Sequence, residues 1–350
     1  GLMDASLRAE KVVIFNMPIM QLSVYACIIA ILWFGGGLIA NGSMETGELI
    51  SFISYVTQIL MSLMMICMAF TNLVISRASL TRITEVLNEQ PVIKDSAQED
   101  LEVADGSIEF RNVTFAYYST AEEVNIKNVN LKIHSGETIG IIGGTGSAKS
   151  TLVQLIPRLY DVNQGEVLVG GRNVKDYKLK TLRSSVAMVL QKNVLFSGTI
   201  KDNLRWGNAQ ATDQEIEESC RAACAHDFIT GFPNGYETEL GQGGVNVSGG
   251  QKQRLCIARA LLCKPKILIL DDSTSAVDTA TDASIRDALK TALKGSTKII
   301  IAQRITSVCE ADRIIVMDDG SISDIGTHKE LLERNEIYRE VYNSQQKGVE

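Results

Sequence analysis

The chain has 350 residues, a formal net charge of −7 and 45% hydrophobic residues. That length suffices for about two domains, and the acidic balance argues against a basic surface for nucleic acid. The seven cysteines show no zinc-type spacing. Cys220 and Cys224 lie four residues apart on a predicted helix near His226, but a further metal ligand is missing. We therefore expect buried, reduced thiols in a cytosolic environment.

Two long stretches near the start of the chain, residues 12–44 and 49–76, lack Asp, Glu, Lys and Arg. Each exceeds the roughly 20 residues that cross a bilayer as a helix. The pattern predicts two membrane-spanning helices, at about 14–40 and 49–76, joined by a turn at 41–48. Basic residues flank the outer ends and two glutamates lie in the turn, so both outer ends are expected in the cytoplasm. The alternative, a buried hairpin of a soluble protein, would carry charges along one stripe.

The second stretch carries two side-chain stripes at helical spacing, one of small polar residues and one of methionines: Ser51, Ser54, Gln58 and Ser62, and Met61, Met64, Met65 and Met68. Polar side chains within a span face other helices or a cavity, and thioethers adapt to varied apolar ligands. Ordinary helix packing, which we favour, and a substrate-lining face are both compatible with this pattern. Two spans cannot enclose a pathway and the chain lacks an initiator methionine, so we expect the C-terminal part of a longer membrane protein.

The pattern changes twice after the second span. Helical character continues to about residue 88, and a polar stretch with Pro91 and an acidic run at 98–100 follows. Strands of alternating or continuous apolar character then alternate with helices; the strands are expected at 108–115, 129–134, 138–142, 186–190, 267–270, 298–302 and 313–317. We predict an α-helical transmembrane hairpin followed by an α/β domain with a mainly parallel sheet. The expected boundaries are 1–88 for the transmembrane part, 89–106 for the linker and 107–348 for the α/β domain.

A glycine-rich loop lies between the strand at 138–142 and a predicted helix at 151–156. Such a loop directs backbone N–H groups and a helix N-terminus toward a polyphosphate. Lys149 adds a positive charge and Ser150 a magnesium ligand. The residue before the lysine is Ala148, where the usual pattern has glycine, and a Cβ there costs about 1–2 kcal/mol if φ is left-handed. The predicted nucleotide-binding residues of this loop are Gly143, Gly144, Thr145, Gly146, Ser147, Ala148, Lys149, Ser150 and Thr151.

Two further segments carry groups suited to nucleotide chemistry. The buried strand near 267–270 ends in two carboxylates: Asp271 is placed to hold magnesium, and Asp272 lies where a base or water-orienting group belongs. About a hundred residues after the glycine-rich loop, a second anion cradle opens the predicted helix 251–262; its residues are Ser248, Gly249, Gly250 and Gln251. One nucleotide cannot easily use both cradles of one domain, so we expect a head-to-tail pair in which the second cradle closes on the partner's nucleotide.

With these motifs in place, residues 107–348 resemble the nucleotide-binding domain of ABC transporters, and the hairpin resembles the last two transmembrane helices of a drug, lipid or peptide exporter half. The resemblance implies ATP and Mg²⁺ as cofactors. It implies that Tyr117 stacks on adenine and that Gln191 contacts magnesium and the attacking water and faces the membrane domain. It also implies that residues 248–251 form the family's signature motif and residues 275–278 its D-loop. It also implies an integral protein of the plasma (inner) membrane, in contact with lipid, with its nucleotide-binding domain in the cytoplasm.

The departures from that family are informative. The family's catalytic glutamate is here Asp272, and its switch histidine is Gln303. One methylene less withdraws the carboxylate by about 1.5 Å, a misplacement of about 1 Å can cost about a hundredfold in rate, and glutamine cannot exchange a proton near neutral pH. With Ala148, three changes fall on the chain's own nucleotide site, whereas the cradle at Ser248 is intact. The pattern predicts the degenerate-site half of a heterodimer.

Three alternatives stay open at this point. One is a homodimeric exporter that hydrolyses ATP slowly at two identical Asp272 sites. Another is a soluble SMC- or MutS-like ATPase acting on DNA, which the uncharged spans and the acidic charge disfavour. The last is a regulatory or channel-type use of the same module. The sequence does not indicate whether the cargo is a small molecule, a lipid or a peptide.

Overall fold

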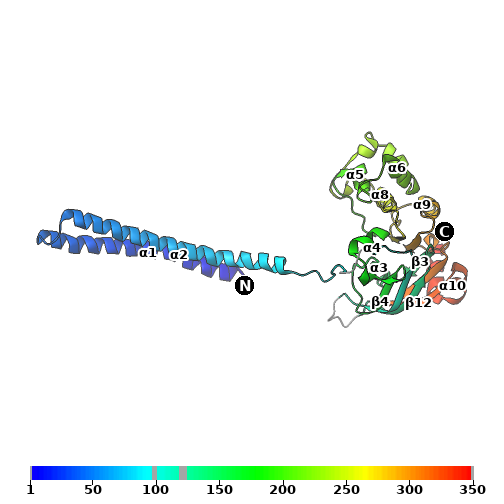
Figure 1. The fold of residues 1–350 in the computed structure, drawn as a ribbon, viewed down its shortest axis with the longest axis horizontal. Coiled ribbons are helices and arrows are strands. Elements are labelled where there is room, and N and C mark those ends of the chain that lie inside the picture. The colour runs from blue at the N-terminus through cyan, green and yellow to red at the C-terminus, as the bar shows by residue number, and fades with distance from the viewer. Residues whose placement is uncertain (1, 97–100, 118–123, 348–350) are drawn as a thin grey trace. The chain divides into compact units, whose positions relative to one another are not determined.

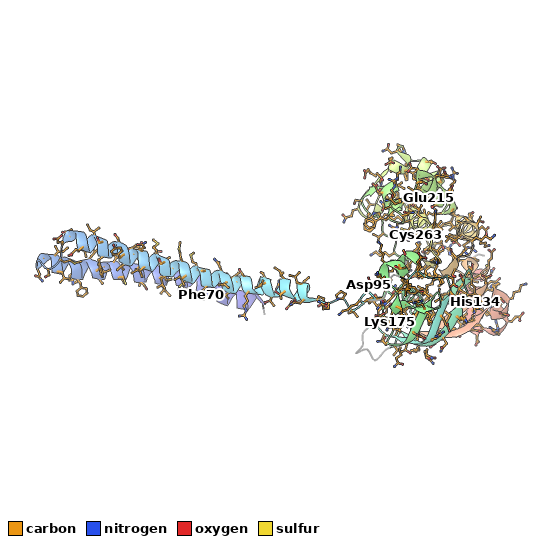
Figure 2. All side chains as sticks on the ribbon, viewed as in Figure 1. Phe70, Asp95, His134, Lys175, Glu215 and Cys263 are labelled. Atoms are coloured by element: carbon orange, nitrogen blue, oxygen red, sulfur yellow. The ribbon has the colours of Figure 1, made fainter. Side chains whose placement is uncertain are left out.

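The computed structural model describes residues 2–96, 101–117 and 124–347, and the chain forms two compact units, residues 1–92 and 93–350. The predicted acidic run at 98–100 lies outside the described residues. In the first unit, α1 (Leu2–Ala40) and α2 (Thr46–Asn88) form an antiparallel hairpin (Figure 1). Both helices contain a stretch long and apolar enough to span a membrane, Pro18–Ala40 and Thr46–Asn88. Side chains project outward along the hairpin, as Phe70 illustrates (Figure 2).

The polar stripe of α2 does not pack against α1. The half-buried residues of α2 follow a different line, which comprises Ile53, Val56, Thr57, Leu60, Met64, Cys67 and Thr71. Ser51, Ser54, Gln58 and Ser62 are exposed, and each of the three serines donates its hydroxyl to the carbonyl four residues earlier at 2.9 Å. These four residues therefore do not contact α1; the packing and the substrate-lining interpretations of the stripe both stay predictions.

The second unit contains a mainly parallel six-stranded sheet in the order β12-β11-β3-β10-β9-β6. Its parallel strands are β3 (Thr138–Gly143), β6 (Val186–Val189), β9 (Ile267–Asp271), β10 (Thr297–Ile301) and β11 (Arg313–Asp318), and β12 (Ser321–Gly326) is antiparallel at the edge. An antiparallel sheet, in the order β2-β1-β4-β5, consists of β1 (Ile108–Phe115), β2 (Ile126–Ile133), β4 (Gln164–Val169) and β5 (Arg172–Asn173). The predicted fold class is confirmed.

The parallel sheet is covered on both faces. Every residue of β9 and β10 is buried, as expected for parallel strands that carry structure on each side. Leu268, Leu270 and Ile300 belong to one core, formed with most of the helices. The second core contains Ile267, Ile269, Ile299 and Ile301, the antiparallel sheet and the helices at 149–154 and 179–185. The helices are α3 (Lys149–Gln154), α4 (Leu179–Ser185), α5 (Ile200–Arg205), α6 (Asp213–Ala222), α7 (His226–Thr230), α8 (Gly249–Leu262), α9 (Thr279–Ala292), α10 (His328–Arg334) and α11 (Glu336–Lys347).

Two local details differ from the sequence analysis. Cys224 does not lie on the helix with Cys220, because α6 ends at Ala222 and Cys224 has φ 52. The pair therefore does not share one helix face. The strand expected from 129 begins earlier, at Ile126, because a left-handed residue, Asn128, interrupts its alternation.

The stretch predicted to be a linker is anchored on the second unit. Asp95 (labelled in Figure 2) accepts a 2.7 Å hydrogen bond from Leu179 N, the first residue of α4. Val103 is buried, and Lys266 Nζ donates to the carbonyl of Ala104 at 3.1 Å. The chain between α2 and β1 is thereby held by the main chain at the start of α4 and by the side chain of Lys266, which precedes β9.

Candidate nucleotide site

The sheet order brings the predicted polar segments to one edge. β3, β10, β9 and β6 are parallel neighbours, so their carboxyl ends meet, which is where ligands of open α/β sheets bind. The register aligns Ile301 of β10 with Ile141 of β3 and with Asp271 of β9. The segments leaving these ends are the glycine-rich loop, Gln303, Asp272 and Gln191. Sequence-distant residues therefore form one site.

The glycine-rich loop turns tightly between β3 and α3. A Cβ on Gly143 would lie 2.3 Å from the carbonyl oxygen of Met317, so this position requires glycine. Ala148 precedes α3 with φ 67 and ψ 24, the left-handed conformation that costs an L-residue about 1–2 kcal/mol. Lys149 Nζ donates to the carbonyls of Gly143 at 2.9 Å and Gly144 at 2.7 Å, and burial lowers its pKa. A phosphate is a stronger acceptor than these carbonyls, so it can draw the ammonium toward itself.

The two predicted magnesium ligands from the loop and the strand are in contact. Ser150 Oγ donates to Asp271 Oδ1 at 3.0 Å, and Asp271 is only 4% exposed. Burial raises the pKa of Asp271. A hydroxyl and a carboxylate are oxygen ligands of the kind that Mg²⁺ prefers, and a bound cation would stabilise the buried carboxylate. The donor set therefore fits magnesium.

Asp272 is the point where the remaining predicted residues converge. It is buried, has φ 47, and accepts two amide hydrogen bonds on the same oxygen, Oδ2: 3.1 Å from Gln191 Nε2 and 2.7 Å from Gln303 Nε2. Burial raises the pKa of Asp272, and these amide donors oppose that rise. The oxygen nearest to the two glutamines is thus already saturated with donors. The catalytic roles of the three residues stay predictions.

Tyr117 lies next to α3. Its hydroxyl is 3.0 Å from Thr151 Oγ1 and donates to Gln154 Oε1 at 3.3 Å. The ring meets those of Phe115 and Tyr160 edge-on or nearly so, with centroids 5.0 Å away in each case. It is 42% exposed, which leaves a face for a purine. Adenine stacking by Tyr117 stays a prediction.

The second cradle is a capped helix start. Ser248 Oγ accepts from Gln251 N at 3.2 Å, and Gln251 Oε1 accepts from Ser248 N at 2.9 Å, so the two side chains form a capping box on α8. Gly250 lies against the main chain, since a Cβ there would be 2.9 Å from Ala276 O. In Figure 1, α8 lies with α5 and α6, whereas α3 lies beside the sheet. The two cradles therefore belong to different parts of the unit.

One connecting residue escaped the sequence analysis. Gln253 of α8 is buried; its Nε2 donates to Ser275 Oγ at 3.2 Å and its Oε1 accepts from Ala276 N at 3.0 Å. It ties the helix of the second cradle to the segment that follows Asp272. The available signal was a polar residue among the apolar positions of α8, two before Leu255 and four before Ile257.

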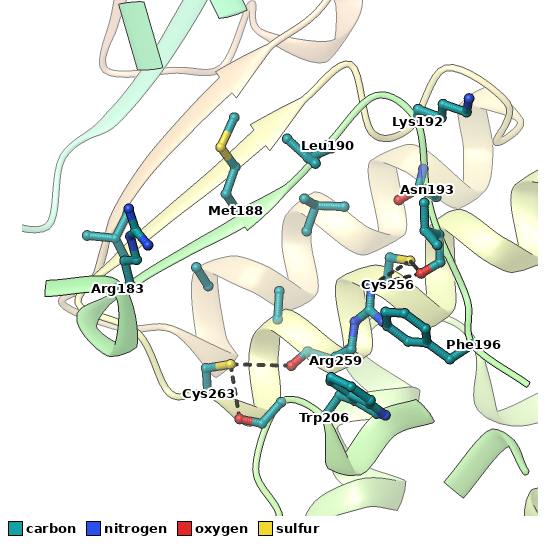
Figure 3. Close-up of a pocket in the computed structure, with 16 residues that line it drawn as sticks. Arg183, Met188, Leu190, Lys192, Asn193, Phe196, Trp206, Cys256, Arg259 and Cys263 are labelled. Carbon is teal, nitrogen blue, oxygen red and sulfur yellow. Dashed lines mark hydrogen bonds between the residues drawn. The ribbon is translucent and has the colours of Figure 1, made fainter. Parts of the chain in front are cut away.

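A separate cavity of about 380 Å³ is lined by β6, the segment that follows it and α8 (Figure 3). Phe196 and Trp206 stack at one side, with ring centroids 4.5 Å apart. Three basic residues line it, Arg183, Lys192 and Arg259, and no carboxylate does so within the part of the chain that the structure describes. It contains none of the loop residues 143–151 and is therefore distinct from the nucleotide site.

Together, the strand–loop–helix arrangement, the lysine and serine of the loop and the aspartates at the end of β9 define a P-loop nucleotide-binding domain. A model of the ABC transporter family matches residues 126–275, and one of the ABC transporter transmembrane region matches residues 2–63. The chain therefore belongs to the ABC transporter family, and its second unit contains the family's ATP-binding domain.

Known relatives support this assignment along most of the chain. The uncharacterized ABC transporter ATP-binding protein YfiB of Bacillus subtilis is 42% identical over 350 residues, covering 98% of this chain and 59% of YfiB. YgaD of the same organism, named as a candidate multidrug export ATP-binding/permease protein, is 39% identical over 311 residues, covering 89% of this chain and 53% of YgaD. The chain thus spans less than two thirds of these relatives' length.

A solved structure of a bacterial Atm1-family ABC exporter with ATP bound has a similar fold. It superposes with a TM-score of 0.89 at 29% identity, covering 98% of this chain and 60% of that one. The predicted resemblance to exporter half-transporters is confirmed.

Proposed function

We propose that the full-length protein binds ATP with Mg²⁺ and couples hydrolysis at a dimer interface to export of a substrate across the membrane. The names of its relatives, the two spans and the P-loop site support this function. The match to the transmembrane region argues against the DNA-acting alternative. The protein lies in the plasma (inner) membrane with its ATP-binding domain in the cytoplasm, and its cargo is a small molecule, a lipid or a peptide.

We further propose that ATP at this chain's own site is hydrolysed slowly. The observation that carries this is the double amide contact to Asp272 Oδ2. A general base must accept a proton from water on a free lone pair, and the short carboxylate has two donors on one oxygen. Gln303 cannot relay that proton, because an amide does not titrate near neutral pH.

The capped start of α8 completes the site of a second half-transporter, which we propose to be a different chain. Its residues are Ser248, Gly249, Gly250 and Gln251, and their cap is intact. A homodimer of slow sites is the alternative, and mass determination of the purified assembly separates the two because a homodimer contains one polypeptide.

The decisive measurement is ATP turnover of the purified full-length assembly with Asp272→Asn in this chain. We expect turnover within about twofold of the unmodified assembly, because the partner's P-loop site does most of the hydrolysis. The matched variant changes the residue at the corresponding position of the partner chain and should abolish turnover. Loss of turnover with Asp272→Asn alone would overturn the slow-site proposal.

A further inference from the structure

The C-terminal helix reaches back to the segment that carries Gln303. Gln345, in the last turns of α11, makes two hydrogen bonds with its side-chain amide: Nε2 donates to the carbonyl of Gln303 at 2.7 Å, and Oε1 accepts from Ile305 N at 2.9 Å. These partners lie 42 and 40 residues earlier in the chain. One planar amide thus holds the main chain on both sides of Arg304.

The segment needs such a contact. A short 3₁₀-helix, Ile305–Ser307, begins there, and Arg304 before it provides no side-chain cap. The N–H groups at the start of a helix have no partner within it. Glutamine offers a donor and an acceptor on one rigid group, so Gln345 supplies the acceptor for Ile305 N and at the same time fixes the orientation of the Gln303 carbonyl.

The position of Gln303 in turn governs Asp272. Its side-chain Nε2 lies 2.7 Å from Asp272 Oδ2, and its main-chain N–H also contacts that carboxyl. The contacts therefore run in series from α11 through Gln345 and Gln303 to the carboxylate at the end of β9. Gln191 Nε2 donates to the same oxygen at 3.1 Å.

We infer that Gln345 is a positioning residue of the nucleotide site: it acts through Gln303 to hold Asp272, and so links the C-terminal helix to the retention of nucleotide. This rests on the proposed function only in taking this edge of the sheet to be an ATP site. It requires neither slow hydrolysis nor a different partner chain. Nothing in the sequence marks Gln345, which is one of two adjacent glutamines in a polar helix.

The neighbouring glutamine is a matched control. Gln346 has the same side chain on the same helix but is exposed, whereas Gln345 is half-buried. Gln345→Ala removes both hydrogen bonds. Gln345→Glu keeps the acceptor for Ile305 N but loses the donor to the Gln303 carbonyl, so it separates the two contacts with little change in size.

The test measures how long each full-length variant, in its native assembly, retains a photoreactive azido-ATP with Mg²⁺. Unlabelled ATP is added, the sample is irradiated after increasing delays, and label on this chain is identified by mass. We expect Gln345→Ala to shorten retention about threefold to tenfold, as suits the loss of neutral hydrogen bonds. Gln345→Glu should shorten it in the same direction, and Gln346→Ala should leave it unchanged.

A double variant separates positioning from general support of the fold. If Gln345 acts through Gln303, its effect should shrink once the Gln303 side chain is removed. Adding Gln345→Ala to Gln303→Ala should therefore shorten retention less than Gln345→Ala does alone, since only the main-chain contact of residue 303 to Asp272 remains. An additive effect in the double variant, or unchanged retention in both Gln345 variants, would overturn the inference. Failure of the slow-site proposal would be seen in a different experiment, as lost ATP turnover with Asp272→Asn. That result would leave the comparison of the Gln345 and Gln346 variants valid.

Discussion

Replacing Asp272 by glutamate tests whether the short carboxylate limits hydrolysis at this site. The added methylene moves the carboxylate outward by about 1.5 Å, which is more than half of the 2.7 Å between Oδ2 and Gln303 Nε2. The longer side chain cannot keep its direction unless the Gln303 amide swings away. Recovery from a misplacement of about 1 Å is worth up to about a hundredfold in rate.

We therefore expect Asp272→Glu alone to raise hydrolysis about tenfold or less, because Gln303 still occupies the space and cannot exchange a proton. Gln303→His alone should change the rate less than about threefold, since the carboxylate stays short. The two together should raise it about a hundredfold, more than the product of the single effects. Variants with glutamate at position 272 should also be less stable, because this residue has φ 47, a conformation that aspartate tolerates better than glutamate.

The assay is single-turnover hydrolysis of radiolabelled ATP bound to this chain in the full-length assembly, with the ratio of ADP to ATP followed over time. The sample in which both residues are unchanged sets the baseline. Full recovery of hydrolysis by Asp272→Glu alone would show that the amide contacts do not obstruct the carboxylate. No recovery in the double variant would show that Asp272 and Gln303 are not what slows the site.

Three further predictions concern strain, charge and helix packing. Ala148→Gly relieves the left-handed φ, and thermal unfolding should show a gain of about 1 kcal/mol, or about 2–4 °C. Burial raises the pKa of Asp271 above its value of 3.8 in the unfolded chain, so its contribution to the free energy of unfolding is complete below pH 3.8 and is lost as pH rises through the higher folded pKa. Asp271→Asn should therefore raise the melting temperature at pH 7, and this gain should shrink toward pH 4. The same variant should weaken Mg²⁺-dependent ATP binding. A Cβ on Gly35 would lie 2.3 Å from Leu49 Cδ1, whereas one on Gly36 meets nothing within 4 Å, so in detergent Gly35→Ala should melt at a lower temperature than Gly36→Ala.

The local sequence is enough to predict the strands and the glycine-rich loop of the nucleotide-binding unit. The run at 267–270 is apolar at every position because both faces of β9 are buried, and a parallel strand of that kind needs no alternation. The glycine-rich loop was predictable because few residues fit where a Cβ would strike the carbonyl of Met317. The glycine that usually precedes the lysine of such a loop indicates a left-handed backbone at Ala148, and the φ of 67 at this residue agrees with that expectation.

The contacts within the site were not predictable in the same way. Gln191 and Gln303 lie 81 and 31 residues from Asp272, and they meet on one oxygen only because β6, β9 and β10 are neighbours in the sheet. No local periodicity encodes that order. Gln345 was missed for the same reason, since its partners are main-chain atoms that any residue would present.

A short chain of contacts connects the carboxylate at the end of β9 with the start of α8. Asp272 begins a short segment that reaches Ser275 and Ala276, and both of these are hydrogen-bonded to Gln253 of α8. The same helix begins at the Ser248 cap, and Gly250 there packs against the carbonyl of Ala276. Were ATP binding to displace Asp272, the displacement would reach the start of α8 through these few residues. Occupancy, rather than turnover, is the quantity that such a connection can communicate.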